Sequence, residues 1–270
     1  MTMSTAEKSG PNSRAPSSLP KARQLEFDAP WNWLAAGWRD IWVMPGLSLG
    51  YGVLVFLASW ALFVLLQRLD ALAMVLVLAG GFLLIGPLLA VGLYRISQRL
   101  EAGAVSLGLS DILLPPRAAR GQLAFFGVLL LLFFSFWVRF AGLLASIFLG
   151  GVTLPPLDKI LQTLLFTPEG LGLLMVGTAS GAVLAALVFA LTAFAVPMLL
   201  ERETDAFSAS RASFTAVLAN LKPMLLWAAL IVVMIAAGIA TAFVGLIFAF
   251  PLIGHASWHA YRDAFGAGGK

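Results

Sequence analysis

The chain has 270 residues, of which 60% are hydrophobic and 11% charged, with a net charge of +4. A soluble domain carries roughly a quarter charged residues, so this composition excludes a water-soluble globule and indicates a protein whose solvent is the lipid bilayer. There is no cysteine, which excludes disulfides, iron–sulfur clusters, thiolate metal sites and cysteine nucleophiles. In a membrane protein, excess Lys and Arg indicate orientation, so we expect no nucleic-acid partner.

The beginning of the chain is polar and differs from everything that follows. Residues 1–28 include Pro11, Pro16 and Pro20 and contain no apolar stretch typical of a secretion signal. We therefore predict a disordered cytoplasmic tail over 1–28. Residues 29–265 are predicted to form a single transmembrane helical domain, and residues 266–270 a second short tail.

Long uncharged stretches predict an all-α, polytopic transmembrane bundle of six helices. About twenty apolar residues cross the roughly 30 Å of hydrocarbon in a bilayer. The predicted spans are residues 47–66, 71–94, 123–150, 171–200, 224–238 and 240–262. The last two divide one apolar run, so a bundle of five helices is the alternative.

Basic residues are distributed unevenly between the predicted loops. With the N-terminus in the cytoplasm, Arg68 and Lys159 are the only basic loop residues on the outer side. Arg262 and Lys270 also favour the cytoplasm, which requires an even number of spans and supports six. The sequence thus predicts a multi-pass protein of a bacterial inner (cytoplasmic) membrane with both termini inside.

Short amphipathic segments precede some of the predicted spans. One carries Trp31, Trp38 and Trp42, and another includes Phe207 and Phe214, with the spacing of helices that lie flat on a membrane. An Asp-Ile pair followed by proline occurs at 40–45 and again at 111–115, each time just before a span. This recurrence predicts three repeats of an amphipathic segment plus a hairpin.

Two features inside the spans are candidates for packing or function. Gly177, Gly181 and Ala185 recur every four residues and predict a smooth face for internal helix packing. Arg139 is the one charge well inside an apolar run, which makes it a candidate intramembrane charge site. Its position in the outer half of the span favours snorkelling to the interface, or pairing with Glu169, over binding of an anion.

His255 and His259 are four residues apart and lie on one helical face, so they are weak candidates for metal binding. No third ligand is evident nearby, and Trp258 and Tyr261 favour an interfacial cap in which the imidazoles face headgroups or a neighbouring helix. We therefore predict no metal and no cofactor. Motifs for hydrolases and phosphate binding are missing, and Glu201 is interpreted as part of a solvated loop.

Several stretches carry a resemblance to a known family. They are residues 29–31, 37–40, 86–94 and 197–199, and above all the ending Pro-Leu-Ile-Gly-His-Ala-Ser-Trp-His-Ala-Tyr-Arg-Asp at 251–263. Over residues 26–265 the chain resembles the predicted bacterial integral membrane family named domain of unknown function 2189. The resemblance implies a membrane location and a helical fold but no activity and no site residues.

Three functions from different classes remain open on the sequence. The missing chemistry favours a non-enzymatic accessory or scaffold component of a membrane assembly, which contacts the bilayer and other membrane proteins. The alternative is a permease or channel for a small solute, with Arg139 as its binding charge. A second alternative is a haem- or metal-binding subunit that uses His255 and His259.

Overall fold

The computed structural model describes residues 21–72, 74–150 and 157–266, and in these ranges the chain is helical with no strand. The all-α class is therefore confirmed. The helices are α1 (Ala29–Val43), α2 (Pro45–Arg68), α3 (Met74–Leu89), α4 (Val91–Glu101), α5 (Leu109–Leu113), α6 (Arg117–Phe148), α7 (Leu157–Phe166), α8 (Pro168–Thr192), α9 (Ala195–Glu201), α10 (Ala206–Ala219), α11 (Leu221–Ala240) and α12 (Leu246–Phe265).

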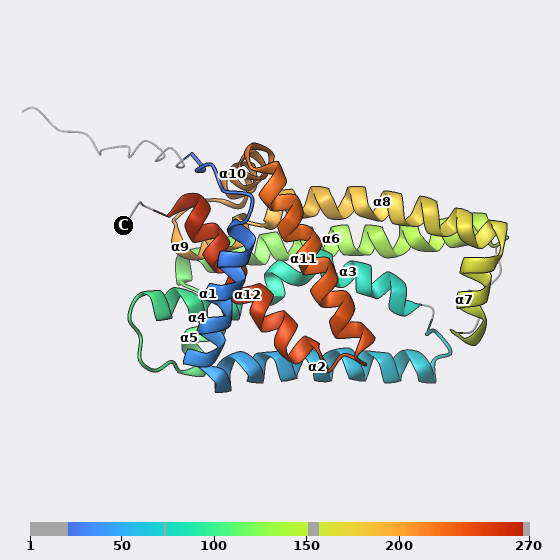
Figure 1. Ribbon diagram of the computed structural model, residues 1–270, viewed down its shortest axis with the longest axis horizontal. Helices are drawn as coiled ribbons and strands as arrows, with labels where there is room; N and C mark the ends of the chain where they lie inside the picture. Colours follow the sequence, from blue (N-terminus) through green and yellow to red (C-terminus); the bar gives the residue numbers. More distant parts are fainter. Residues whose placement is uncertain (1–20, 73, 151–156, 267–270) are drawn as a thin grey trace, which may run out of the picture.

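Among the described residues, five long helical segments are apolar enough to cross a membrane, which confirms a polytopic bundle. They are Pro45–Arg68, Met74–Glu101, Arg117–Phe148, Pro168–Glu201 and Leu221–Ala240. The sixth predicted span corresponds to α12, whose first half is apolar and whose second half is polar, so α12 is not among these five. It nevertheless returns antiparallel to α11 (Figure 1).

Two breaks within the helices have local causes. Between α8 and α9 the helix is interrupted at Ala193 and Phe194, because the ring of Pro197 clashes with the carbonyl four residues earlier and supplies no N–H. The last helix begins at Leu246 rather than at residue 240, because Ala242 and Phe243 adopt positive φ angles of 52° and 67° in the turn after α11. This turn makes the α11–α12 hairpin.

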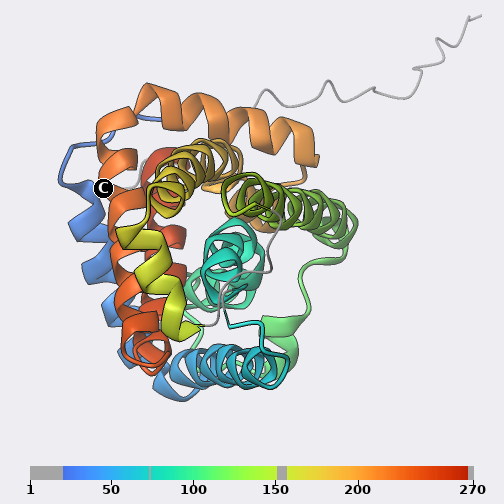
Figure 2. The same cartoon turned by 90° about the vertical axis from the view of Figure 1, so that its right-hand side faces the viewer.

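The helices α2, α3, α6 and α8 run along the long axis of the molecule, whereas α11 and α12 cross it obliquely and α1 lies across it (Figure 1). In the end-on view α3 occupies the middle, surrounded by α2, α6, α8 and the α11–α12 hairpin (Figure 2). We call the end where α4, α9 and α12 finish and α6 begins the basic end. It carries Arg95, Arg99, Arg117, Arg120, Arg202, Arg211, Lys222 and Arg262. The last turn of α2 and the helix α7 lie at the opposite end (Figure 1).

The helix α1 is amphipathic, as its sequence predicts. Trp31, Trp38 and Trp42 are exposed, whereas Trp33 and Ile41 are buried. The buried face packs along α12, where Gly37 allows the two backbones to approach closely. A short helix thus stands before each of the three hairpins, α1 before α2 and α3, α5 before α6 and α8, and α10 before α11 and α12.

The residues just before α1 differ from the predicted disordered tail. Residues 1–20 of that tail lie outside the described part, but residues 21–28, which have no regular secondary structure until the turn at 27–28, are held by specific bonds. The side chain of Asn220 accepts a hydrogen bond from the Leu25 amide at 2.7 Å and donates one to the Arg23 carbonyl at 2.9 Å. The Arg23 amide bonds to the Ala264 carbonyl. The polar composition of these residues predicted disorder. Composition alone does not reveal a hydrogen-bond partner that lies nearly 200 residues away in the chain.

Candidate functional site

The second half of α12 is the most polar part of the bundle interior. His255 and His259 are one turn apart on one face, and Trp258 and Arg262 are one turn apart on another. The helix carries both pairs to the basic end, between α1, α2, α4 and α9. Two separate polar clusters result, one around each face.

The first, which we call the serine–histidine cluster, joins α12 to three other helices. It comprises Asp40, Ser48, Ser97, His255 and His259. His255 contacts Ser48 Oγ through Nε2 at 3.0 Å and Ser97 Oγ through Nδ1 at 2.8 Å. Ser97 donates to Asp40 Oδ2 at 2.5 Å, and His259 Nε2 contacts the same oxygen at 2.9 Å.

One arrangement of protons satisfies every contact of a neutral His255. A carboxylate accepts only, so the Ser97 hydroxyl donates to Asp40 and must itself accept from Nδ1–H of His255. Nε2 is then the acceptor for the Ser48 hydroxyl. The donors of this chain of hydrogen bonds all point from Ser48 toward Asp40, and its first three members, Ser48, His255 and Ser97, are buried. Such a fully satisfied network fixes the positions of α2, α4 and α12 relative to one another.

The Ser48–His255 pair has the spacing of a nucleophile and its base, but it does not have the open surroundings that such a pair needs for catalysis. Both side chains have no exposed surface, and both nitrogens of His255 are occupied by serine hydroxyls. Asp40 Oδ2 is 4.0 Å from Nδ1, so the carboxylate orients the ring through Ser97 rather than directly. An acyl-transfer site needs space for a substrate next to the serine oxygen, and this cluster offers a closed helix contact instead.

Asp40 lies on α1, outside the spanning helices, and its pKa is below the ordinary 3.8. Burial raises the pKa, but the hydrogen bonds from His259 and Ser97 and the charges of the two histidines lower it by more. A lowered pKa in the folded protein means that the ionised carboxylate stabilises the fold above pH 3.8 and that this contribution is lost as the pH falls below it.

We therefore expect Asp40→Asn to lower the thermal stability of the detergent-solubilised protein near neutral pH. The carboxylate accepts both hydrogen bonds as a charged group, whereas the asparagine amide is uncharged. The gap between the variant and the wild type should shrink as the pH falls below 3.8 and through the lowered pKa of Asp40, where the carboxylate itself becomes protonated. Circular dichroism melts across a pH series measure this. Equal stability of the variant and the wild type near neutral pH would show that the charge of Asp40 contributes nothing.

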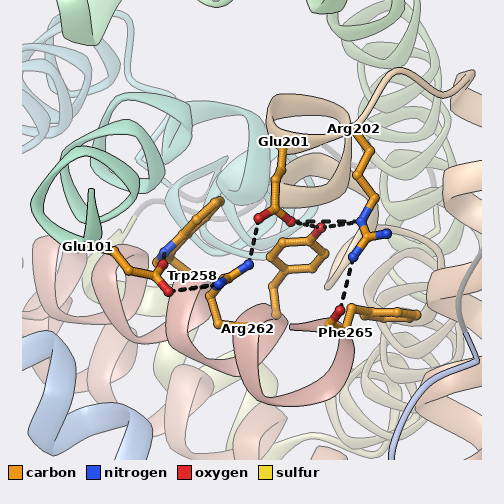
Figure 3. A network of polar contacts seen from close by, with 7 residues as sticks. Glu101, Glu201, Arg202, Trp258, Arg262 and Phe265 are labelled. Carbon is orange, nitrogen blue, oxygen red and sulfur yellow. Dashed lines mark hydrogen bonds and ion pairs between the residues drawn. The ribbon is translucent and has the colours of Figure 1, made fainter. Parts of the chain in front are cut away.

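The second cluster, which we call the arginine–glutamate network, ties the ends of α4, α9 and α12 together (Figure 3). It comprises Glu101, Glu201, Arg202, Trp258, Tyr261 and Arg262. Arg262 stands between the two carboxylates and donates to Glu101 at 2.9 Å and to Glu201 at 2.5 Å. One guanidinium thus bridges two helix ends.

Further bonds hold each carboxylate in place. Trp258 Nε1 donates to Glu101 at 3.1 Å, and the Tyr261 hydroxyl donates to Glu201. Arg202 donates to the Tyr261 oxygen and to the Phe265 carbonyl, each at 3.0 Å. Figure 3 shows these side chains converging from the three helix ends. The geometry is that of a structural tie, with each charge facing an opposite charge or a donor.

These clusters correct two interpretations of the sequence. Trp258 and Tyr261 are buried in the helix bundle and do not form an interfacial cap, whereas His255 faces neighbouring helices, one of the two positions expected for the imidazoles. Glu201 is the last residue of α9 and belongs to the arginine–glutamate network rather than to a loop. The helix α1, which packs along α12, is distant from it in sequence.

The two histidines lie near one carboxylate, yet their geometry is not that of a metal site. Asp40 contacts His259, while both ring nitrogens of His255 are engaged by serines. Within residues 21–72, 74–150 and 157–266, no group of three or more His, Asp or Glu side chains is arranged to hold a metal ion.

The predicted small face of α8 is divided between two environments. Gly181 lies against the ring of Trp137 on α6, where an added Cβ would come within 2.9 Å of the indole, and Ala185 is partly buried. Gly177 has no neighbouring atom within 4 Å of that position. Of the two glycines, Gly181 is therefore the one that packs closely against α6.

Arg139 is exposed on α6 and, in the part of the chain that is described, forms no ion pair, with Glu169 or otherwise. It lies 22 residues beyond Arg117, which places it about 33 Å along the helix from the basic end at 1.5 Å per residue. This distance matches the thickness of the hydrocarbon and brings the guanidinium to the far interface.

We expect Arg139→Ala to leave the unfolding temperature of the detergent-solubilised protein within about 2 °C of the wild type, since an exposed charge at an interface contributes little. Arg95→Ala is the comparison. Arg95 is buried and donates to Gln98 and to the Asp111 carbonyl, so its loss should destabilise the protein clearly. Equal destabilisation by the two variants would contradict the interfacial position of Arg139.

Comparison with known proteins finds one family model that is similar to part of the chain. Residues 74–201, just under half of the chain, match the family model described as "Predicted integral membrane protein (DUF2189)". This confirms the resemblance for α3 to α9, while the ending at 251–263 lies beyond the matched region. No curated protein and no solved structure gives a significant match to the chain.

Proposed function

We propose that this multi-span integral membrane protein is a non-enzymatic accessory or scaffold component of an assembly in a bacterial inner membrane, with its basic end in the cytoplasm. The observation that carries the proposal is that its reactive side chains are engaged in contacts between helices. His255, Ser48 and Ser97 are enclosed between helices, and Arg262 is held between two glutamates. These groups stabilise helix contacts and leave no open site of titratable residues around them.

The surface of the basic end supports the same proposal. On α1, Trp31, Trp38 and Trp42 form an exposed aromatic row across the bundle, backed by the close contact of α1 with α12. On α10, Phe207 and Leu218 are also exposed. Rigidly mounted aromatic side chains at the level of the lipid headgroups are suited to contacts with neighbouring membrane proteins. Excess basic charge at this end favours the cytoplasmic side.

Affinity purification from native membranes at natural abundance, followed by mass spectrometry, tests the proposal. We expect at least one other membrane protein in stoichiometric amount, and we expect it to be lost when Trp31, Trp38 and Trp42 are replaced by alanine. Replacement of Leu131, Leu132 and Phe136 by alanine is the matched control, because these α6 side chains are similarly exposed but lie along the span. A protein that purifies alone would overturn the proposal.

The two alternatives receive less support from the geometry. A permease that uses Arg139 would need that residue at a cavity or between helices, whereas it is exposed on α6. A haem- or metal-binding role would require His255 to release both of its serine partners. Absorbance spectra and elemental analysis of the purified protein test the second alternative directly.

A further inference from the structure

A large cavity in the described part of the protein lies between α3, α8, α11 and α12, with α10 at one end. Its volume is about 720 Å³, which falls within the usual range of ligand sites. The walls are almost entirely apolar. Leu84, Pro87, Phe189, Trp227 and Phe250 are among the lining side chains. A cavity of this composition takes an apolar ligand.

The cavity opens sideways, toward the hydrocarbon of the bilayer. Among its lining residues, Leu187 on α8 and Leu225, Val232 and Val233 on α11 are exposed on the surface of the spanning helices. The helices α8 and α11 lie on opposite sides of this opening and scarcely touch, while each packs against other helices. A molecule dissolved in the membrane can therefore reach the cavity without passing through water.

A polar atom without a partner marks the inner wall near the basic end. The hydroxyl of Thr192 is buried, lines the cavity and is the one enclosed side-chain polar atom of the described residues that has no hydrogen-bond partner. A buried hydroxyl that stays unpaired is unfavourable, so we expect a bound ligand to supply the missing acceptor. Tyr94 and Ser257 line the same cavity.

Positive charge flanks the cavity where α10 meets α11. Arg211 lies three and seven residues before the lining residues Phe214 and Leu218, hence on the same face of α10. Lys222 lies between the lining residues Leu221 and Leu225. Both basic side chains belong to exposed residues, and neither forms an ion pair within the described ranges.

The level of Thr192 relative to these charges follows from α10. Ser213 on α10 bonds to the Ala190 carbonyl at 2.8 Å and to the Phe194 amide at 3.1 Å, so Thr192 and the Arg211 turn of α10 lie at similar depth. The order of these groups matches the parts of a phospholipid. The cations lie at the level of a headgroup, the hydroxyl at the level of the ester region, and the apolar cavity where an acyl chain would extend.

We propose that this cavity binds one acyl chain of an anionic phospholipid, which enters between α8 and α11 and places its phosphate beside Arg211 and Lys222. An ester oxygen of the lipid accepts a hydrogen bond from Thr192.

Native mass spectrometry of the purified full chain, titrated with phosphatidylglycerol or with phosphatidylcholine of identical chains, tests the proposal. We expect one tightly bound phosphatidylglycerol and about tenfold weaker binding of phosphatidylcholine, because the choline ammonium of the second lipid offsets the phosphate charge and is repelled by Arg211 and Lys222. The double variant Arg211→Gln, Lys222→Gln should lose this preference. Equal retention of the two lipids by the wild type would overturn the anionic specificity.

A second pair of variants tests the cavity itself. Ala186→Trp places an indole in the lining, whereas Ala179→Trp adds the same side chain to an exposed position two turns away on α8 that does not line the cavity. We expect the first to abolish tight binding of phosphatidylglycerol and the second to preserve it. Unchanged binding by a folded Ala186→Trp variant contradicts the site.

Fluorescence provides a measurement that does not depend on a bulky substitution. Trp227 is buried and lines the cavity, so phosphatidylglycerol with a brominated chain should quench part of the tryptophan emission in a saturable manner. That saturable part should disappear in Trp227→Phe. Quenching that is unsaturable, or that persists in Trp227→Phe, would place the chain elsewhere. Lipid binding and partner copurification are separate readouts, so this proposal and the scaffold proposal fail independently.

Discussion

Replacing Gly37 by leucine is expected to be the most damaging single substitution at the α1–α12 contact. A Cβ at this position would come within 2.7 Å of the Ala256 backbone nitrogen and 3.1 Å of the Leu252 carbonyl oxygen. Backbone atoms of a packed helix cannot move aside as a flexible side chain can. Overpacking costs about 1–3 kcal/mol where side chains can adjust, so we expect about 3 kcal/mol or more here.

The matched control for Gly37 lies in the next helix. Gly50, on α2, has nothing within 4 Å of an added Cβ, so Gly50→Leu should be neutral, and it gains up to about 1 kcal/mol of helix propensity. Thermal unfolding of both variants in the same detergent, followed by circular dichroism, measures the difference. If Gly37→Leu and Gly50→Leu melted together, the close approach of α1 and α12 would be refuted.

Arg262→Ala is expected to have the second large effect, because it removes the bridge between the ends of α4 and α9. Glu101 and Glu201 would face each other without their shared cation. Charge-assisted bonds contribute about 1.5–3 kcal/mol each, but the Arg262 side chain is 29% exposed and partly screened by water. We expect a loss of about 2 kcal/mol in unfolding free energy, less at high salt.

Two further variants separate the bridge from charge alone. Arg262→Lys keeps the charge but cannot span both carboxylates with a planar fork, so it should recover only part of the stability. Arg39→Ala removes an exposed arginine of α1 and should change little. Denaturant titrations of the three proteins at low and high salt provide the comparison. Full recovery by lysine would mean that net charge, rather than the geometry of the bridge, stabilises the basic end.

The hydrophobic pattern of the sequence predicted the spanning helices well because each is determined by its own residues. A run of apolar side chains needs lipid around it, whatever its neighbours are. The predicted spans 47–66 and 171–200 therefore fall inside Pro45–Arg68 and Pro168–Glu201. The turn before α12 was misplaced by six residues because it is made by Ala242 and Phe243, which have no turn signature in sequence.

The polar clusters could not be predicted because their members are far apart in the chain. Ser48 and His255 are separated by 207 residues, and Asp40 and His259 by 219. His255 and His259 attracted attention by their spacing, but no local pattern indicates that serines occupy the nitrogens of His255. Asp40 also belongs to the Asp-Ile repeat, whose second copy contains Asp111. That aspartate instead pairs with Arg99 on the neighbouring helix. The two copies of the repeat therefore place their aspartates in different kinds of contact.

The position of α12 in the chain determines when the bundle can be completed. It is synthesised after the other described helices, yet it carries the partners of Asp40, Ser48, Ser97, Glu101 and Glu201. Until α12 inserts, these groups on earlier helices have no partner from it, and Gly37 has no α12 backbone to approach. Nascent chains shorter than about residue 255 are therefore expected to remain open assemblies that quality-control proteases recognise.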